Sequence, residues 1–204
     1  MRILAVADVE SKYFYDFYQP GRLKEFDLIV ACGDLSREYL EFLVTMAGCP
    51  LLYVRGNHDD AFEEAPPEGC VCIEDQIFEY RGVRFLGLGG SYRYNEKGTY
   101  MYTEKEMKAR IRRLWFRIRY HGGFDVLVTH APAHRLGDMD DLPHRGFVCF
   151  AGLLDKYSPK YMLHGHVHRN YGMNVPIRTK YKDTMIINAF EHHVFSYEDE
   201  ICGK

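Results

Sequence analysis

Residues 28–34 read LIVACGD, an apolar run that ends at a glycine followed by an aspartate. A run without polar alternation is typical of a strand that is covered on both faces. Four further apolar runs end in the same way, at Asp8, near Asn57, at His130 and shortly before His166. Because the carboxyl ends of strands in an α/β sheet converge on one crevice, these five ends predict that polar side chains far apart in the sequence meet at one point.

Strands of this kind alternate with amphipathic stretches, which indicates an α/β fold and a single domain over residues 1–204. Three helices are expected: one begins at Ser36, one opens with the capping-box sequence Thr103-Glu104-Lys105-Glu106, and one ends before Pro159. The apolar stripe of the second helix is expected to comprise Met107, Ile111, Leu114, Trp115 and Ile118. The expected strands are Arg2–Ala7, Asp27–Ala31, Leu51–Val54, Val71–Glu79, Val83–Leu88, Asp125–Thr129, Lys160–Leu163, Thr184–Asn188 and His193–Tyr197.

The composition is that of an ordinary globular chain of 204 residues, 47% apolar and 27% charged, with a net charge of -3. This charge gives no general drive toward nucleic acid or acidic membranes, so binding to either would need a local patch. The N-terminal run is too short for a signal peptide, and nowhere do about 18 apolar residues run uninterrupted, so no membrane span or membrane partner is expected. The six cysteines form no CxxC pair, and we interpret them as reduced thiols of a cytoplasmic protein.

The residues at the strand ends are of the types that bind metal ions. Taken singly, each has an ordinary structural interpretation as a turn, cap or core residue, but their joint occurrence favours metal binding. Carboxylates, an amide oxygen and imidazoles suit a borderline divalent ion such as Mn²⁺, Fe²⁺, Zn²⁺ or Co²⁺. Such a set is too large for one tetrahedral site and fits two ions about 3.5–4 Å apart, with Asp34 as the natural bridging anion. The expected metal ligands are Asp8, Asp34, Asn57, His130, His166 and His168.

Taken together, Asp8, Gly33-Asp34, Gly56-Asn57-His58-Asp59, His130 and Gly165-His166-Val167-His168 resemble the calcineurin-like metallophosphoesterases. The resemblance implies two mixed β-sheets packed as a sandwich and flanked by helices. It also implies that Asp34 bridges two ions, that Asp8 and His168 hold the first, and that the remaining ligands hold the second. His58 would stabilise the transition state or protonate the leaving oxygen, with Asp59 behind it as the orienting partner. The same adjacency also allows Asp59 simply to cap the next turn.

One position departs from the family pattern, which has histidine where this chain has Glu10. A ligating Glu10 would harden the first site and shift its preference toward Mn²⁺, Fe or Mg²⁺ over Zn²⁺. Alternatively, Glu10 points away and leaves the first site weak or empty. Two divalent ions are therefore expected, Mn²⁺ or Fe first, with Zn²⁺, Co²⁺ and Mg²⁺ as alternatives.

The resemblance implies a metal-dependent phosphoric ester hydrolase in which a metal-bound hydroxide attacks phosphorus in line. The expected partner is a small phosphate ester. The short loops resemble those of diesterase-like members, which favours a phosphodiester, such as a nucleotide, over a phosphomonoester. A phosphoprotein phosphatase would usually need a longer chain with a substrate-docking groove. The alternative is a non-catalytic scaffold that keeps this fold with a weakened first metal site. The basic second helix could bind nucleic acid, but a solvated helix face is the more ordinary interpretation. Oligomerisation is left open.

Two loop residues are candidates for binding the substrate. Arg93 lies in the Gly- and aromatic-rich loop of residues 89–95 and could contact a phosphate. His134 lies in the loop of residues 131–145, which directly follows His130 and must therefore begin near the metals.

Overall fold

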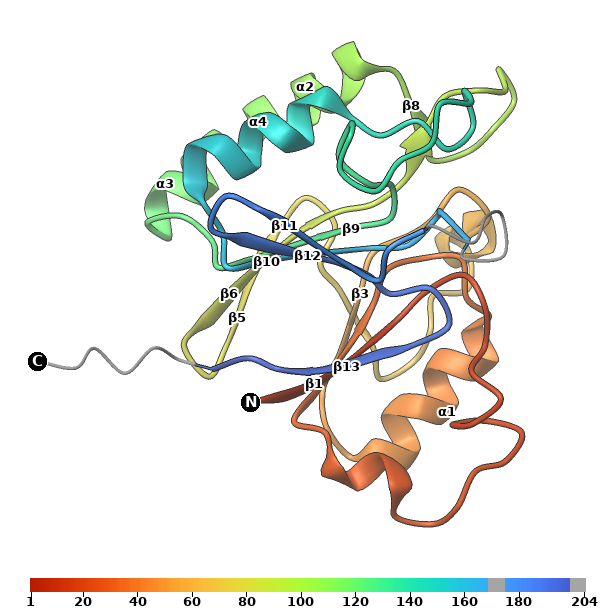
Figure 1. Ribbon diagram of the computed structural model, residues 1–204. Coiled ribbons are helices and arrows are strands. Elements are labelled where there is room, and N and C mark those ends of the chain that lie inside the picture. Colours follow the sequence, from red (N-terminus) through yellow and green to blue (C-terminus); the bar gives the residue numbers. More distant parts are fainter. Residues whose placement is uncertain (169–174, 199–204) are drawn as a thin grey trace, which may run out of the picture.

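The computed structural model describes residues 1–168 and 175–198, and in these two ranges the protein is a four-layered α/β structure (Figure 1). Two β-sheets face each other. On the outer side of one sheet lies α1 (Arg37–Ala47), and on the outer side of the other lie α2 (Glu104–Arg113), α3 (Trp115–Tyr120) and α4 (Val148–Tyr157). The fold class expected from the sequence, a sandwich of two mixed sheets flanked by helices, is confirmed.

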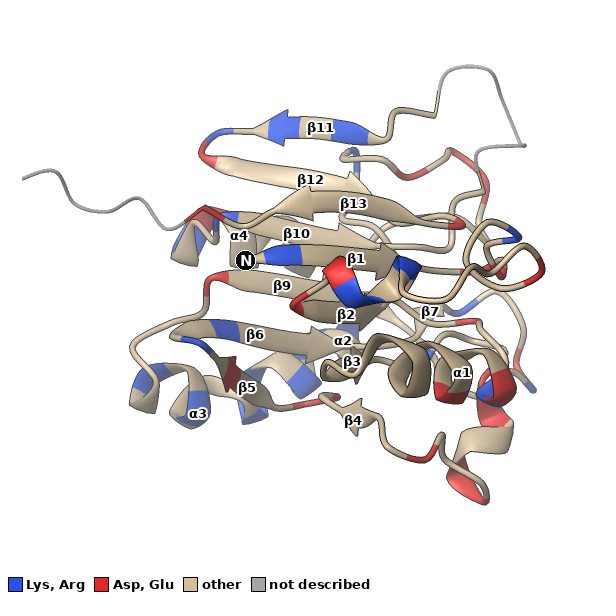
Figure 2. Cartoon of the chain, turned by 90° about the horizontal axis from the view of Figure 1, so that it is seen from below, with Lys and Arg blue, Asp and Glu red and all other residues tan. Residues whose placement is uncertain are grey.

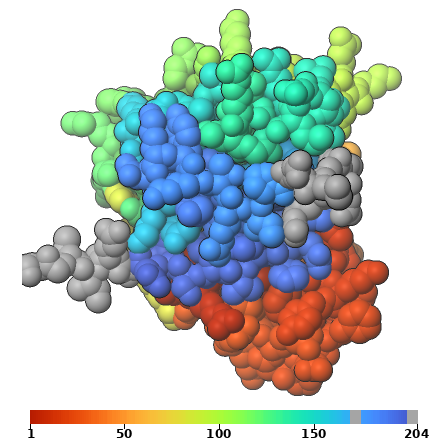
Figure 3. Space-filling view, viewed as in Figure 1, coloured from red at the N-terminus to blue at the C-terminus, as the bar shows by residue number. Residues whose placement is uncertain are grey.

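The first sheet has five strands in the order β13-β1-β2-β3-β4. Strands β1 to β4 run parallel, and β13 pairs antiparallel with β1. Because the last strand of the sequence joins the first sheet, the C-terminal strands cover the middle of the face shown in Figure 3. The strand bounds are β1 Arg2–Val6, β2 Leu28–Ala31, β3 Leu51–Tyr53, β4 Val71–Cys72 and β13 His193–Ser196.

The second sheet has six strands in the order β11-β12-β10-β9-β6-β5, and both of its outer strands are antiparallel to their neighbours. Strands β7 and β8 form a separate parallel pair. The bounds are β5 Ile77–Tyr80, β6 Val83–Leu88, β7 Ser91–Tyr92, β8 Met101–Tyr102, β9 Val126–Thr129, β10 Tyr161–His164, β11 Arg178–Tyr181 and β12 Thr184–Asn188. The chain also forms two 3-10 helices, η1 Arg22–Glu25 and η2 Asp60–Glu63.

The central strands are apolar throughout because both of their faces are covered. In β1, Ile3 and Ala5 belong to the core between the two sheets, whereas Leu4 and Val6 pack under α1. In β9, Val126 and Val128 face the other sheet and Leu127 packs under the helices of the second layer. Alternate side chains of a strand point to opposite faces, so each strand needs apolar residues at every position.

The expected helix starts are confirmed by their caps. Ser36 accepts a hydrogen bond from the backbone N–H of Tyr39, and Thr103 and Glu106 form a capping box at the start of α2. The second expected helix is interrupted at Leu114, and Trp115 is 44% exposed rather than part of the apolar stripe.

One expected strand, Val71–Glu79, is wrong. Its first part is β4 of the five-stranded sheet, and its end begins β5 of the six-stranded sheet. Between them Asp75 adopts a left-handed backbone conformation with φ 52, which turns the chain from one sheet to the other. Val83–Leu88 and Thr184–Asn188 are found with the expected bounds, and the short strands β7, β8 and β11 were not expected.

Within residues 1–168 and 175–198 the five cysteines are free thiols, and Cys202 lies outside the described residues. No helix of these two ranges has the length and apolarity needed to span a bilayer.

Candidate metal centre

The carboxyl ends of the parallel strands in both sheets open on one cavity of about 460 Å³. Strands β1 and β2 deliver Asp8 and Asp34 to it, and β10 delivers His166 and His168. The convergence that the five strand ends predict is therefore found. The cavity is lined by Asp8, Asp34, Asn57, His58, Tyr94, Pro143, His144, His166 and His168.

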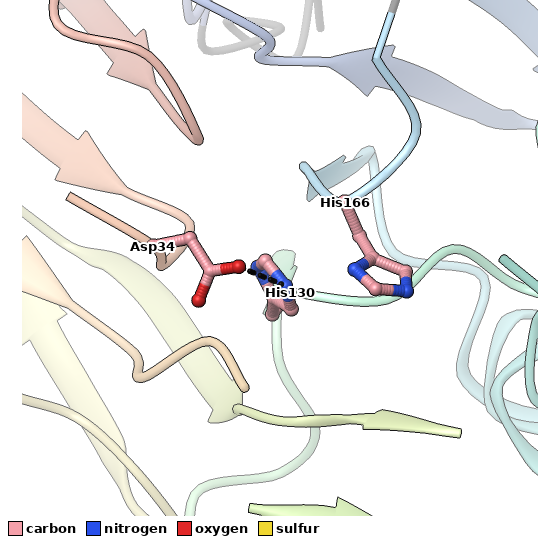
Figure 4. Close-up of side chains that lie close together, drawn as sticks. All are labelled: Asp34, His130 and His166. Carbon is pink, nitrogen blue, oxygen red and sulfur yellow. Dashed lines mark ion pairs between the residues drawn. The ribbon is translucent and has the colours of Figure 1, made fainter. Parts of the chain in front are cut away.

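Three ligand-type side chains form the tightest cluster, namely Asp34, His130 and His166 (Figure 4). One ligand atom from each lies within 4.8 Å of those of the other two. His130 Nε2 is 3.4 Å from Asp34 Oδ2 and 3.1 Å from Asn57 Oδ1. These residues come from the ends of three strands and the loop after β3, so the fold itself assembles the cluster.

The two histidine rings of the cluster are oriented by backbone carbonyls. His130 Nδ1 lies 2.8 Å from the carbonyl oxygen of Cys32, and His166 Nε2 lies 2.7 Å from that of Pro143. Because a carbonyl oxygen only accepts, both of these ring nitrogens carry the proton. In His166 the opposite nitrogen is then free to accept, as a metal ligand requires. His130 Nε2 instead faces the acceptor oxygens of Asn57 and Asp34, so in the metal-free protein it also holds a proton, which a metal ion would displace.

The backbone at the strand ends is adapted to bring these residues close together. Asp8, Asp34 and His166 all have left-handed backbone conformations, with φ of 65, 56 and 67. A Cβ atom at Gly33 would lie 2.4 Å from the backbone nitrogen of Gly56. Since side chains cannot occupy such a gap, glycine is needed here for the close approach of two loops as well as for its φ of 92.

The second part of the centre is built around Asp8, whose side chain is almost completely buried. Its carboxylate accepts hydrogen bonds from the backbone N–H of His166 at 2.9 and 3.0 Å. His168 Nε2 lies 3.8 Å from Asp8 Oδ1, and the His168 ring packs on Phe190 with 4.9 Å between ring centroids. Asp8 and His168, expected to share the first ion, are therefore neighbours.

Burial and mutual charge shift the pKa values of the cluster in opposite directions. Burial raises the pKa of Asp8 to about 7. Burial also favours neutral Asp34, but the charge and hydrogen bond of His130 outweigh this and hold the Asp34 pKa well below its usual range. Burial favours a neutral His130 ring, but the charge and hydrogen bond of Asp34 outweigh burial and raise the pKa of His130 to about 9. Burial lowers the pKa of His166 to about 3.

The donors fit divalent metal ions in number and in kind. Carboxylate and amide oxygens combined with imidazole nitrogens are ligands for borderline ions such as Mn²⁺, Fe²⁺ and Zn²⁺. Two carboxylates are largely buried here, and no Lys or Arg is among the described residues that line the cavity. A bound cation would compensate these charges, so the residues present fit the metals that the sequence predicts.

His58 and Asp59 occupy different positions relative to the cavity. His58 is exposed and lines it, while its backbone N–H donates to Asp34 Oδ1 at 2.8 Å. Asp59 is buried, and its Oδ2 accepts from the backbone N–H groups of Asp34 at 2.8 Å and Gly56 at 2.7 Å. The contacts of Asp59 are thus with the ligand-bearing loops, and the expected orienting contact with the His58 ring is not formed.

Glu10 is not among the residues that line the cavity. Its Oε1 accepts a hydrogen bond from the hydroxyl of Ser36, the residue that caps α1. The Glu10 carboxylate is therefore bonded at the start of α1 and does not line the cavity.

The two expected substrate contacts are also directed elsewhere. Arg93 donates to the carbonyl of Met101 at 3.0 Å and pairs with Glu106, and His134 pairs with Asp138 at 2.9 Å. Neither residue lines the cavity.

The cavity is lined instead by neighbours that the sequence did not single out. Tyr94, the residue after Arg93, accepts a hydrogen bond from Asn57 Nδ2 at 3.4 Å. His144, in the same loop as His134, lies with its ring 5.4 Å from that of His166. The sequence identified both loops, but the residue that faces the cavity depends on the loop path.

The fold and this donor cluster define a metallophosphoesterase type of centre. The chain belongs to the calcineurin-like phosphoesterase family, whose sequence pattern matches residues 1–170. The resemblance drawn from the motifs is confirmed, and membership supports a metal-dependent phosphoesterase in general terms.

Individual relatives resemble the chain along most of its length. The uncharacterized protein MJ1162 of Methanocaldococcus jannaschii is 22% identical over 216 residues, which cover 97% of this chain and 92% of that protein. The structure of TT1561 from Thermus thermophilus has a TM-score of 0.64 and 16% identity, over 93% of this chain and 89% of its own. Another crystal structure has a TM-score of 0.67 and 15% identity, over 93% of this chain and 90% of that chain. At these identities the structures show the shared fold alone.

Proposed function

We propose that the protein is a two-metal phosphodiesterase whose ions are held by Asp8, Asp34, Asn57, His130, His166 and His168. The observation that carries the proposal is the cluster of Asp34, His130 and His166 within 4.8 Å, next to Asp8 and in one cavity with His168. Asp34, whose Oδ2 is 3.4 Å from His130 Nε2 and which shares the cavity with Asp8, would bridge the two ions.

Two divalent ions, when bound, would neutralise charge on the phosphoryl group and make a water molecule more acidic. The chain positions this chemistry through fixed groups. His130 and His166 are held by carbonyl oxygens, and Asn57 is oriented by Tyr94. His58 stands at the cavity, where its imidazole can give a proton to the leaving oxygen. No protein nucleophile is required.

The charges around the cavity support a diester as the substrate. A phosphomonoester group carries between one and two negative charges at neutral pH, whereas a diester carries one. Among the described residues, no Lys or Arg lines the cavity to neutralise a second charge. Three oxygen donors combined with three imidazoles suit borderline divalent ions, and of these we propose Mn²⁺ or Fe. The free thiols of the described cysteines support a cytoplasmic location.

The test is hydrolysis of bis-p-nitrophenyl phosphate and p-nitrophenyl phosphate by metal-stripped protein, with and without added Mn²⁺. The proposal expects Mn²⁺-dependent turnover that is greater on the diester. It also expects His58→Ala to lower kcat by about 10²–10⁴-fold, the contribution of a general acid, while the metal content is unchanged. Turnover that persists without metal would refute it.

A second function, a non-catalytic scaffold, is favoured by one observation. Glu10 is bonded to Ser36, so the position that is histidine in the family pattern supplies no ligand to the cavity. On this alternative the first site stays weak, and no divalent ion gives turnover of either ester although the chain still binds one ion.

A further inference from the structure

The outer face of α3 exposes aromatic side chains that the core does not use. Phe116 is 76% exposed and Tyr120 87%, and Trp115, 44% exposed, packs edge-on against Phe116 with ring centroids 4.7 Å apart. Phe116 and Tyr120 are four residues apart on a helix, so they project from the same face. Single exposed aromatics are ordinary, but three together on one helix form an apolar surface patch.

Four arginines lie on or next to this helix. Within α3, at 100° per residue, Arg119 falls on one side of the Phe116–Tyr120 line and Arg117 falls on the other. Arg112 and Arg113 are the last two residues of α2, directly before the break at Leu114. In the described part of the chain, the guanidinium groups of these four form no ion pair and no hydrogen bond, unlike those of Arg37, Arg84 or Arg93. We call Arg112, Arg113, Trp115, Phe116, Arg117, Arg119 and Tyr120 the aromatic–arginine patch.

The stretch of sequence that carries the patch has no acidic residue. Residues 107–124 contain no Asp or Glu, although the whole chain has more acidic than basic residues. Figure 2 shows Lys and Arg along α3, and acidic residues on other elements, β5 and α1 among them. The net charge of -3 therefore conceals a surface of concentrated positive charge.

The patch lies at the end of the molecule opposite the metal centre. The turn after α3 leads directly into the start of β9, where the backbone N–H of Gly123 donates to the carbonyl of Ile118 and that of Asp125 donates to the carbonyl of Arg84. The ligands, by contrast, follow the carboxyl ends of the strands. A partner bound at the patch would leave the cavity accessible.

We propose that the aromatic–arginine patch docks the protein reversibly on an anionic lipid bilayer. Aromatic rings with polar neighbours settle at the level of the lipid headgroups, and surrounding guanidinium groups contact the phosphates. Cations on both sides of a protruding aromatic pair match this geometry. A nucleic-acid duplex bound through its phosphates would use the arginines but would leave Phe116 and Tyr120 without a role. Single-stranded nucleic acid, whose bases can stack on aromatic rings, is distinguished by the experiment below.

An adjoining feature enlarges the apolar contact surface. A hollow of about 550 Å³ is lined by residues of α2, α3 and α4, mainly by apolar side chains that include Ile111, Phe116 and Leu153. It extends the apolar surface beyond the exposed rings, and two of its lining residues, Arg112 and Lys156, are cations. The proposal replaces the expectation, drawn from net charge, that the protein has no membrane partner.

The experiment uses Trp115, the one tryptophan of the chain, as the reporter. Its fluorescence is followed while the full chain is titrated with vesicles of phosphatidylcholine alone or mixed with phosphatidylglycerol, and binding is confirmed by co-sedimentation. The proposal expects a blue shift and co-sedimentation with the anionic vesicles only, both weakened by added salt.

Two double variants separate the two components of the patch. Phe116→Ser with Tyr120→Ser, and Arg113→Gln with Arg117→Gln, should each weaken binding to anionic vesicles by at least about tenfold. Phe17→Ser is the matched control, because Phe17 is 68% exposed but lies outside the patch, and it should bind as the unmodified chain does. Thermal melts of all variants establish that each is folded.

Several results would overturn the proposal. These are absence of binding to anionic vesicles, equal binding to neutral vesicles, or vesicle binding that the Phe116→Ser/Tyr120→Ser variant retains in full. Binding to single-stranded RNA without binding to vesicles would assign the patch to nucleic acid instead.

Discussion

The backbone N–H of His166 donates to both carboxylate oxygens of Asp8, and this contact joins the end of β10 in one sheet to the end of β1 in the other. The two residues are 158 positions apart in the sequence. Both have left-handed backbone conformations, so the chain turns sharply at the point where the sheets meet. The geometry of the metal centre therefore depends on how closely these two turns approach.

Gly165 controls this approach. A Cβ atom there would lie 2.6 Å from the Cβ of Ala7 and 2.7 Å from Asp8 Oδ2. Gly165→Ala should therefore destabilise the fold by about 1–3 kcal/mol, as overpacking does, and should weaken Mn²⁺ binding by displacing Asp8. Chemical denaturation and Mn²⁺ titration measure both effects.

Gly152→Ala is the matched control for that variant. Gly152 lies within α4, and a Cβ atom added to it would have no other atom within 4 Å, so alanine should stabilise the protein by about 0.5–1 kcal/mol. If Gly165→Ala kept normal Mn²⁺ affinity, the close approach would not be important for the site.

Asp59 holds the loops that carry Asp34 and Asn57. Asp59→Ala would leave two backbone N–H groups without their acceptor, and each such group costs about 1–3 kcal/mol when buried. We expect a marked loss of stability and of Mn²⁺ affinity, whereas His58→Ala should lower kcat with stability unchanged. An Asp59→Ala variant of normal stability whose pH–rate profile matched that of His58→Ala would restore the orienting role expected from the sequence.

Glu10 interacts with Ser36 rather than with the cavity. Glu10→Gln should leave the number of bound Mn²⁺ ions and their affinity unchanged, because the amide oxygen can still accept from the Ser36 hydroxyl. Glu10→His, which restores the family residue, should tighten the weaker ion. Equilibrium metal analysis distinguishes these outcomes, and loss of an ion in Glu10→Gln would show that Glu10 is a ligand.

Mn²⁺ affinity should rise with pH between about 6 and 9, because binding displaces protons from the ligands. In the metal-free protein, burial raises the pKa of Asp8 to about 7, and the charge of Asp34 outweighs burial and raises the pKa of His130 to about 9. Below these values the two groups are protonated, so raising the pH removes the competing protons. Competition titrations at several pH values measure the effect, and a pH-independent affinity across this window would contradict the assignment of Asp8 and His130 as ligands.

Local patterns in the sequence predicted an α/β fold and the location of the centre, whereas the sandwich of two sheets was implied by the resemblance to the calcineurin-like metallophosphoesterases. Apolar runs such as residues 28–34 identify strands covered on both faces, and the polar residues that follow them lie at the shared carboxyl ends. The crossing from β4 to β5 was missed because Asp75 adopts a left-handed conformation without a glycine or proline to mark the turn.

Loop side chains were harder to predict than strand ends. The sequence selected Arg93 and His134 by residue type, but pairing with Glu106 and Asp138 directs both away from the cavity. Their neighbours Tyr94 and His144 line it instead. Only the path of a loop decides which residue faces a site, and long-range packing sets that path.

The central claim is a pair of ions bridged by Asp34, and the number of Mn²⁺ ions bound per chain at equilibrium tests it most directly. The account predicts two ions for the unmodified chain, and a weakening of both in Asp34→Asn, because this carboxylate lies beside His130 and shares the cavity with Asp8. A single ion in the unmodified chain, or two ions bound normally by Asp34→Asn, would contradict it.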